Sequence, residues 1–337
     1  MLRTAIIGNG KGINRYHIPF ILKTGKFEIT TVYSRSGKSK WAPVEGVHYT
    51  TDINDIWADN PDLVVISTPS DTHAAYARLV LEHGFNALVD KPFAETAEEA
   101  EELFALAKQK GLFLQCYQNR RFDSDFLTVQ KVIESGKLGD LLEVEMHFDY
   151  YRPEIPGNVH TYSRINSYVY GHACHTVDQV LSYFGEPEHI VYDVRQLLGE
   201  GRMNDYFDMD FFYPGPLKVS VKSSYFRLKE RASFIVYGKK GVFVKQTKDR
   251  QEEHLKQFYM PDHEDFGLDL PEHYGTLTYI DDSGDVHEER VVSERGDYAR
   301  FYEAVYVSIA EGKEKLVKDE ETIAQLRILE KACEHLK

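Results

Sequence analysis

Residues 1–120 alternate short apolar runs with segments of helical periodicity. The run at 63–67 contains no charged side chain, which is typical of a strand buried on both faces. Gly84 and Gly111 each stand directly after a helical segment, where many helices end in the left-handed conformation. Strands are expected at 4–7, 27–33, 47–50, 63–67, 88–89 and 112–117, and helices at 16–23, 53–57, 73–83 and 96–110. This alternation predicts a doubly wound parallel sheet, an α/β fold.

The pattern changes after residue 121. A helical segment at 123–135 ends at Gly136, and period-2 alternation follows at 142–150, 207–212 and 217–221. Apolar runs at 233–236 and 242–244 flank the turn at 237–241 and predict a hairpin. Two amphipathic helices, 298–311 and 319–335, end the chain. We therefore expect two domains, residues 1–121 and 122–337, the second an α+β layer with a large, mostly antiparallel open sheet.

Composition narrows the class of protein. The 337 residues are 42% hydrophobic and 28% charged, which fits neither a disordered chain nor a membrane protein. The net charge is −14, with the acidic excess beyond residue 120, which argues against nucleic-acid and membrane partners. Cys116, Cys174 and Cys333 lack the spacing of a disulfide framework and are expected to be thiols. Because a strand begins almost at once, no signal peptide is expected, and we predict a cytoplasmic location.

A glycine-rich turn follows the first strand and opens the first helix. In a G-x-G-x-x-G motif at this place, the first glycine makes the tight turn and the second lets the backbone approach a pyrophosphate. The helix N-terminus then binds the phosphates through its N–H groups. Here the third glycine comes one residue early. The predicted contacts with a dinucleotide are Gly8, Asn9, Gly10, Lys11, Gly12 and Ile13.

The end of the second strand bears on the choice of nucleotide. Enzymes that use NAD normally carry an acidic residue there, which binds the ribose 2′-hydroxyl. This chain has Ser34 and Arg35, and Arg35 could hold a 2′-phosphate together with Lys38 and Lys40. NADP(H) is therefore favoured, with NAD(H) possible. The alternative is that Arg35 stacks on adenine in either case.

Two further strands end in polar residues. Ser67, Thr68 and Pro69 follow the strand at 63–67 and could line the nicotinamide riboside, or could serve only as helix caps. Lys91 follows the strand at 88–89, and Pro92 stops the chain directly after it. A lysine at the carboxyl edge of a parallel sheet faces the usual ligand crevice, although a lone surface lysine can also stand there.

Four motifs in this order resemble the Gfo/Idh/MocA oxidoreductases, the glucose–fructose oxidoreductase and inositol dehydrogenase group. They are Gly8-x-Gly10, the Ser67–Thr68–Pro69 turn with His73, Asp90–Lys91–Pro92, and Gly-His-Ala-Cys-His-Thr-Val-Asp at 171–178. The segments at 117–123 and 147–153 resemble a bacterial subgroup of undefined substrate. The resemblance implies a Rossmann domain followed by a substrate domain. It also implies a homodimer or homotetramer through the C-terminal sheet, for which an open face with Met146, Phe148 and Phe211 is a candidate.

The resemblance also implies the catalytic residues. His175 would take the hydroxyl proton of an alcohol while hydride passes to nicotinamide, and Lys91 would hold the same oxygen. Many members carry an aspartate four residues before this histidine, where this chain has Gly171. Either Asp178, His172 or Tyr170 orients His175 instead, or Lys91 and His175 act alone. Asp178 could also be an ion-pair residue. Remaining cofactor contacts are expected at Ser67, Thr68, Pro69, His73, Asp90, Lys91 and Asn119, and substrate contacts at Tyr117, Tyr150, Arg152, His172 and Asp178.

A metal site at His172, Cys174 and His175 is not expected, because neighbouring helix residues point in different directions. The function predicted first is NADP-dependent hydride transfer between nicotinamide and a small-molecule substrate, a sugar, polyol or related cyclic alcohol or ketone. The alternatives are a biliverdin-reductase-like reductase of a non-sugar substrate and a catalytically silent NAD(P)-binding regulatory protein.

Overall fold

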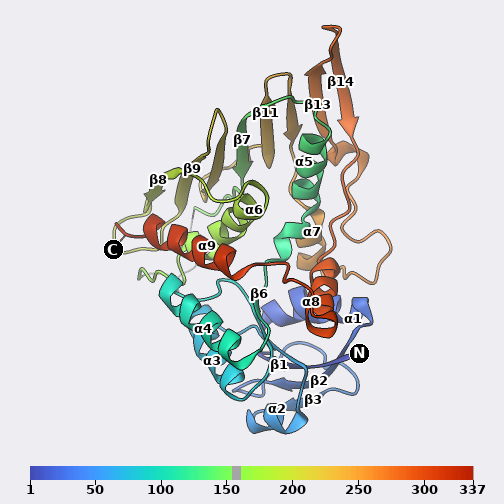
Figure 1. Cartoon of the computed structure of the whole chain (residues 1–337), viewed down its shortest axis with the longest axis vertical. Helices are drawn as coiled ribbons and strands as arrows, with labels where there is room; N and C mark the ends of the chain where they lie inside the picture. The colour runs from blue at the N-terminus through green and yellow to red at the C-terminus, as the bar shows by residue number, and fades with distance from the viewer. Residues whose placement is uncertain (154–160, 337) are drawn as a thin grey trace. The chain divides into compact units, whose positions relative to one another are not determined.

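A computed structural model of the chain describes residues 1–153 and 161–336 (Figure 1). Its contacts divide the chain into two compact units. Unit 1 is Met1–Asn119, Leu255–Glu264 and Tyr298–Arg327, and unit 2 is Arg120–His254, Asp265–Asp297 and Ile328–Lys337. This division differs from the ranges 1–121 and 122–337, because two later segments pack with the N-terminal residues. Phe20, for example, packs on Tyr298 with ring centroids 5.3 Å apart.

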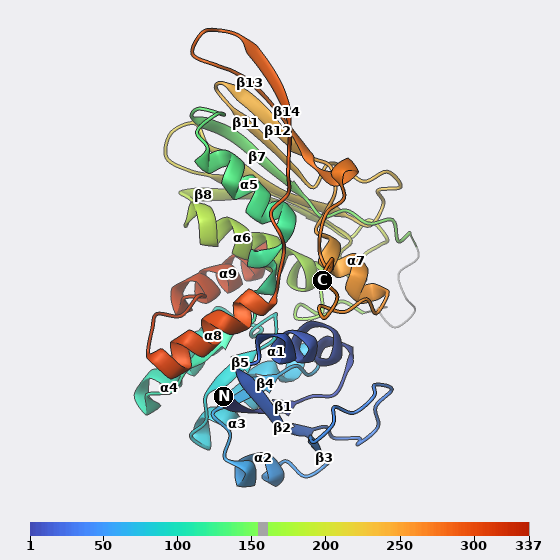
Figure 2. The ribbon, with the colours of Figure 1, turned by 90° about the vertical axis from the view of Figure 1, so that its right-hand side faces the viewer.

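Unit 1 is built on a six-stranded sheet in the order β3-β2-β1-β4-β5-β6, in which every pairing is parallel (Figure 2). This is the predicted doubly wound sheet. Its strands are β1 (Leu2–Ile7), β2 (Phe27–Tyr33), β3 (His48–Thr50), β4 (Leu63–Ile66), β5 (Ala87–Val89) and β6 (Leu114–Cys116). The four residues of β4 are all buried, as the uninterrupted apolar run predicts.

The helices of unit 1 follow the predicted order. They are α1 (Ile18–Thr24), α2 (Asn54–Asp59), α3 (His73–Glu82), α4 (Ala97–Lys110) and α8 (Ala299–Glu311), with α9 (Asp319–Ala332) shared between the units. Thr96 caps α4 by accepting from the backbone N–H of Glu99 at 3.1 Å, and Gly111 ends the helix at a φ of +66°. The helix expected at 16–23 is instead a π-helical turn, Ile13–His17, followed by α1. Pro19 lies in the first turn of α1 and has no N–H to continue the earlier hydrogen-bond pattern.

Unit 2 is built on an eight-stranded sheet in the order β14-β13-β12-β11-β7-β10-β9-β8. Only the β7–β10 pair is parallel among these strands, so the sheet is mostly antiparallel, as predicted. The strands are β7 (Leu141–His147), β8 (His189–Arg195), β9 (Tyr206–Phe212), β10 (Lys218–Ser224), β11 (Phe234–Gly238), β12 (Gly241–Lys245), β13 (Gly275–Ile280) and β14 (Val286–Val291). The helices are α5 (Ser124–Glu134), α6 (Cys174–Phe184) and α7 (Arg250–Lys256), whose last residues belong to unit 1.

One face of this sheet is the core of unit 2. Helix α5 contacts β11 and β12, and α6 contacts β10. Met146 and Phe211 were expected on the open face, but they are 1% and 0% exposed. The alternation of each strand and the pairing of Met146 with Val221 place both residues on the covered face. These two residues therefore cannot form an oligomer interface, and that part of the expectation was wrong.

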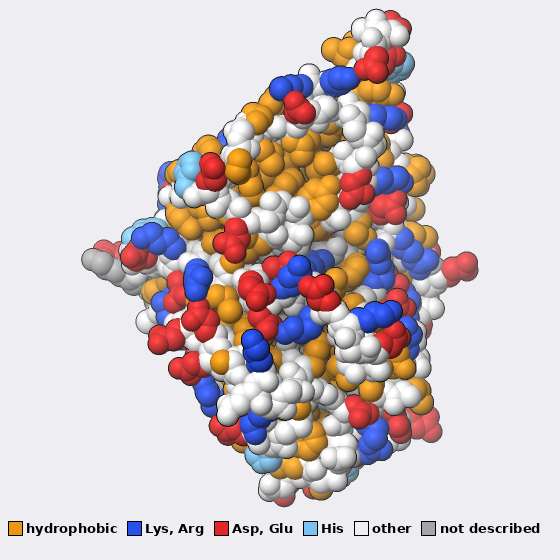
Figure 3. Space-filling model, in the orientation of Figure 1, with side chains coloured by type: hydrophobic (Ala, Val, Ile, Leu, Met, Phe, Trp, Pro, Cys, Tyr) orange, Lys and Arg blue, Asp and Glu red, His pale blue; other side chains and the backbone are white. Residues whose placement is uncertain are grey.

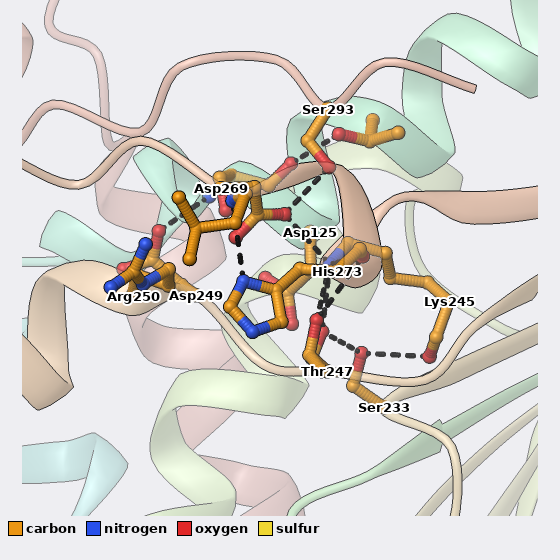
Figure 4. A network of polar contacts seen from close by, with 12 residues as sticks. Asp125, Ser233, Lys245, Thr247, Asp249, Arg250, Asp269, His273 and Ser293 are labelled. Atoms are coloured by element: carbon orange, nitrogen blue, oxygen red, sulfur yellow. Dashed lines mark hydrogen bonds and ion pairs between the residues drawn. The ribbon is translucent and has the colours of Figure 1, made fainter. Parts of the chain in front are cut away.

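A buried polar network surrounds Lys245 in unit 2 (Figure 4). Its ammonium group is fully buried and forms an ion pair with Asp269 at 2.9 Å, and it also donates to Thr247 Oγ1 at 2.7 Å. Asp249 accepts from the backbone N–H of Ser124 at 2.9 Å. Burial, together with the charge of Asp125, raises the pKa of Asp249 to about 7. The network thus holds an acid that titrates near neutral pH.

The surface shown in Figure 3 mixes acidic and basic side chains, and hydrophobic side chains gather over the region of the eight-stranded sheet. Within residues 1–153 and 161–336, no helix is long and apolar enough to cross a membrane. Within these same residues, no group of three or more His, Cys, Asp or Glu side chains could hold a metal ion. Cys116, Cys174 and Cys333 are buried thiols, as predicted.

Candidate active site

Predicted cofactor residues from three strands lie together at the carboxyl edge of the parallel sheet. Strand pairing sets Ile7 beside Ile66, and Ile66 beside Val89. The residues that follow these strands, Gly8, Ser67 and Asp90, are therefore neighbours at one edge. This is the edge where open α/β sheets bind their ligands.

The glycine turn after β1 is closely packed on its inner side. Gly8 has a φ of +121°, and a Cβ there would lie 2.1 Å from the carbonyl oxygen of Ser67. A Cβ on Gly12 would lie 2.7 Å from Ser67 Oγ, whereas nothing lies within 4 Å of the Cβ position of Gly10. Gly12 thus allows the close packing usually assigned to the third glycine, and Ile13 is buried. The open side at Gly10 fits a backbone that a pyrophosphate can approach.

Asp90 connects this turn to Lys91. Its carboxylate accepts from Ser67 Oγ at 2.8 Å and from the backbone N–H of Lys91 at 2.8 Å, and it lies 3.4 Å from His17 Nε2. Burial opposes the charge on this carboxylate, but the contact with His17 and the charges of His73 and Lys91 hold its pKa well below its usual value. Asp90 therefore acts within the protein, as an anchor for the backbone that carries Lys91.

His17 and Tyr302 take part in the site although their sequence contexts did not single them out. His17 is fully buried, its Nδ1 lies 2.6 Å from the hydroxyl of Tyr302, and its ring packs on Tyr117 with centroids 4.1 Å apart. Its spacing from Ile13 and Phe20 puts His17 on the apolar stripe of a helix, which was the available signal. No local pattern connects Tyr302 with a residue 285 positions earlier.

Two predicted contact residues have structural partners. His73 Nδ1 lies 2.7 Å from the carbonyl oxygen of Pro92, and its Nε2 lies 2.9 Å from that of Thr68, so His73 joins the turns after β4 and β5. Tyr117 is buried, and its hydroxyl donates to the carbonyl oxygen of Tyr16. Both side chains therefore support the edge from within unit 1. Asn119, expected at the cofactor, is also buried.

The end of β2 is open to solvent. Ser34 is half-buried, and its N–H donates to the carbonyl oxygen of Thr50 at 3.0 Å. Arg35 follows as an exposed side chain. Its position beyond β2 is where a ribose 2′-substituent binds in dinucleotide folds.

In unit 2, α6 carries His175 and Asp178 in its first two turns, directly after a π-helical turn, Val169–Ala173. Both side chains are buried, at 8% and 3% exposure. Arg121 donates from Nε to one oxygen of Asp178 at 2.8 Å and from Nη2 to the other at 2.7 Å. Asp178 is thus an ion-pair residue, the alternative left open above. Nothing lies within 4 Å of a Cβ position on Gly171, so that site has room for a side chain.

The other substrate candidates of unit 2 lie together. The rings of Tyr150 and His172 have centroids 5.4 Å apart, and the guanidinium of Arg152 lies 4.3 Å from the centroid of Tyr150. Tyr168 and Tyr225, which were not predicted as substrate contacts, complete the cluster. The ring centroids of Tyr168 and His172 are 4.4 Å apart, and Tyr168 also packs on Tyr225. Burial raises the pKa of Tyr150, so its hydroxyl stays protonated at neutral pH.

A dinucleotide fold with a lysine at its carboxyl edge, followed by an α+β unit, defines a class of nicotinamide-dependent oxidoreductase, and the chain belongs to the Gfo/Idh/MocA oxidoreductase family. Residues 2–118 match its NAD-binding Rossmann fold, and residues 130–336 match its C-terminal alpha/beta domain.

Individual relatives span nearly the whole chain. The uncharacterized oxidoreductase YhhX of Escherichia coli (strain K12) is 43% identical over 99% of this chain and 96% of its own length. The crystal structure of a probable oxidoreductase yhhX has a TM-score of 0.94 at 42% identity and covers 100% of this chain and 98% of its own. The scyllo-inositol 2-dehydrogenase (NADP(+)) IolW of Bacillus subtilis (strain 168) is 31% identical over 100% of this chain and 94% of its own. The chain is therefore similar in sequence to a dehydrogenase and, over its full length, to oxidoreductase structures.

Proposed function

We propose that the protein is an NADP-dependent oxidoreductase that transfers hydride between nicotinamide and a sugar, polyol or related cyclic alcohol or ketone. The observation that carries this proposal is the packing of the glycine turn onto the loop that holds Lys91. Gly12 lies against Ser67, and Ser67 donates to Asp90 next to the lysine. One edge thus combines a place for a dinucleotide with a cation for a reacting oxygen.

The residues at this edge fit a nicotinamide dinucleotide. Gly8, Gly10 and the start of the π-helical turn at Ile13 would hold the pyrophosphate, because the turn is open at Gly10. Ser67 and Thr68 would lie towards the nicotinamide riboside. The bound cofactor would supply the hydride acceptor or donor.

Lys91 and His175 have separate proposed roles. The ammonium of Lys91 would stabilise the negative charge that develops on the substrate oxygen. His175 would take the hydroxyl proton during oxidation and return it during reduction, because an imidazole titrates near neutral pH. Their places in the family motifs support these roles.

Replacing the lysine tests the function. Lys91→Met should leave NADPH binding within about threefold of wild type and lower kcat by roughly 10²–10³-fold, the usual effect of removing a group that stabilises an oxyanion. Lys110→Met, at the exposed end of α4, is the control and should turn over normally. Full activity of Lys91→Met would refute the role of the lysine.

The preference for NADP(H) rests on Ser34 and Arg35 in place of the acidic residue, and a relative that uses NADP(+) supports it. Fluorescence titration should show tighter binding of NADPH than of NADH. Arg35→Gln should reduce this difference, whereas Arg78→Gln, on α3, should not. Tighter binding of NADH by the wild type would overturn the preference.

The missing aspartate at Gly171 favours one second candidate, a regulatory protein that binds NAD(P) without turnover. A screen of NADP+ reduction with sugars, polyols and cyclic alcohols separates the two. Tight binding of cofactor with no turnover of any compound would favour the regulator.

A homodimer or homotetramer through the larger sheet also remains a proposal. Ile235 pairs with Val244 and Tyr237 pairs with Val242, and these four side chains alternate with the buried ones of β11 and β12. They form an apolar band on the open face, which suits a contact between copies. Light scattering should show an oligomer, and Tyr237→Lys should dissociate it. We likewise propose a cytoplasmic location, which the three thiols support.

A further inference from the structure

An aromatic cluster lies beside the helix that carries His175. Tyr168 packs on Tyr225 with ring centroids 4.2 Å apart, and Tyr150 meets His172 at 5.4 Å. His172 stands three residues before His175, in the π-helical turn that leads into α6. The chain therefore keeps this cluster close to the proposed base.

Main-chain hydrogen bonds hold the cluster in place beyond the regular strands. The N–H of Tyr150 donates to the carbonyl oxygen of Ser224 at 3.0 Å, and that of Arg227 donates to the carbonyl oxygen of Tyr150 at 3.1 Å. The N–H of Arg152 donates to the carbonyl oxygen of Tyr225 at 2.7 Å. Tyr150 and Arg152 are thus positioned by backbone pairing.

Several cations near the cluster are compensated by carboxylates. These pairs are Arg231 with Asp149 at 2.8 Å, Lys248 with Glu230 at 2.9 Å, and Arg120 with Asp123 at 3.0 Å and Glu252 at 3.1 Å. Their charges are therefore balanced within unit 2.

Arg152 and Arg227 differ from these cations in their ion pairing. Within residues 1–153 and 161–336, no carboxylate forms an ion pair with either guanidinium. Arg152 stacks at 4.3 Å from the centroid of Tyr150 and 5.6 Å from that of Tyr225, and Nε of Arg227 is buried with no hydrogen-bond partner in the same ranges. The guanidinium of Arg152 also forms a side-chain hydrogen bond with Tyr225. A guanidinium has five N–H donors, so the others can bind a planar or tetrahedral anion. Two cations without a carboxylate partner among the described residues are notable in a chain of net charge −14.

The geometry points to an anion subsite at Arg152, so that the substrate is a polyol or sugar that carries a carboxylate or a phosphate monoester. The anionic group binds the edge of the guanidinium, and the aromatic cluster contacts the carbon skeleton. This assignment rests on the proposed function, which supplies the hydroxyl that is oxidised. It adds the charge of the substrate to that function.

Matched pairs of compounds test the assignment, because the members of a pair differ only in the anionic group. Initial rates of NADP+ reduction are compared for gluconate against sorbitol and for glucose 6-phosphate against glucose. At least one anionic member should have a kcat/KM at least about tenfold above its neutral counterpart. Which pair shows the preference decides between carboxylate and phosphate. Added salt should reduce the preference, because Arg152 is exposed.

Three variants connect the preference with the residue. Arg152→Gln should abolish it, and Arg152→Lys should keep part of it. Arg195→Gln is the matched control, since Arg195 also lies over a tyrosine ring, at 5.2 Å from Tyr206, but is paired with Asp193. The control should keep the full preference. Equal or better use of both neutral members, or an unchanged preference in Arg152→Gln, would overturn the subsite.

A binding measurement separates this inference from the proposed function. Thermal shifts are recorded with NADPH present and each of the four compounds added. If no compound is turned over, the proposed function fails on that screen. A shift with gluconate or glucose 6-phosphate that is absent with its neutral counterpart and lost in Arg152→Gln would still support the subsite. No difference within either pair would refute it.

Discussion

The ion pair between Arg121 and Asp178 gives the sharpest test of how α6 is held. Both side chains are less than a tenth exposed, and two charge-assisted hydrogen bonds of 2.8 and 2.7 Å join them. Asp178→Asn or Arg121→Met leaves the other group charged and buried. Removing one partner of such a pair costs about 3–5 kcal/mol. A loss of that size should lower the melting temperature by roughly 10 °C.

The double variant Arg121→Met/Asp178→Leu removes both charges at once. Replacing a buried pair by apolar side chains of similar volume is often neutral, so the double variant should melt near the wild type. Arg195→Met is the exposed control, because its pair with Asp193 is open to solvent and should contribute little. Thermal denaturation followed by circular dichroism measures the wild type and these four variants. A double variant that melts as low as the single ones would refute the reasoning.

The same variants decide whether Asp178 acts on His175. If the aspartate serves only in the ion pair, the pH profile of kcat/KM of Asp178→Asn keeps the wild-type midpoints. If it orients the histidine, the midpoint assigned to His175 moves. We expect an unchanged profile, because the two-fold hydrogen bonding to Arg121 gives Asp178 a structural role that does not depend on His175.

Gly8→Ala should abolish NADPH binding and lower the melting temperature, because its Cβ would lie 2.1 Å from the carbonyl oxygen of Ser67 at a φ of +121°; normal binding in a fluorescence titration would contradict this. Gly171→Asp should melt within about 1 °C of wild type, since its Cβ position is open, and should raise kcat by placing a carboxylate one turn before His175; a lower kcat would show that the aspartate is not what the site lacks. The raised pKa of Asp249 means that the folded state binds its proton more tightly than the unfolded state, so this group's contribution to stability is lost as pH rises from about 4 to 7. Asp249→Asn should therefore show a smaller fall in melting temperature between pH 5 and pH 8 than wild type, and an equal fall would exclude this assignment.

Local patterns predicted most elements and the edge that carries the site. The uninterrupted apolar run of β4, the caps of α4 and the alternation of β9 each depend on near neighbours in the chain, and each is found in the structure. The motif after β1 predicted a tight turn, and the structure shows that this turn packs closely on Ser67 because β1 and β4 are neighbours. Family membership, shown by both matched ranges, agrees with the motifs.

Other features depended on contacts between distant residues. The period-2 pattern showed that Met146 lies on one face of its strand, but not which face the helices cover. The assignment of α8 to unit 1 depends on packing against α1, which its amphipathic pattern alone does not specify. The motif that contains His73 predicted a cofactor contact, and only the structure shows that the same ring also joins the carbonyl oxygens of Pro92 and Thr68.

The sequence by itself determined the class of fold and the polar residues that follow each strand at the carboxyl edge. These follow from periodicity and from motifs a few residues long. Only the tertiary structure decided the partners of the charged groups. It paired Asp178 with Arg121, placed His17 beneath Asp90, and left Arg152 on an aromatic cluster without a carboxylate in the described ranges. The physical reason is that the partners of a charged group are the side chains that the fold brings next to it, and these come from segments far apart in the chain.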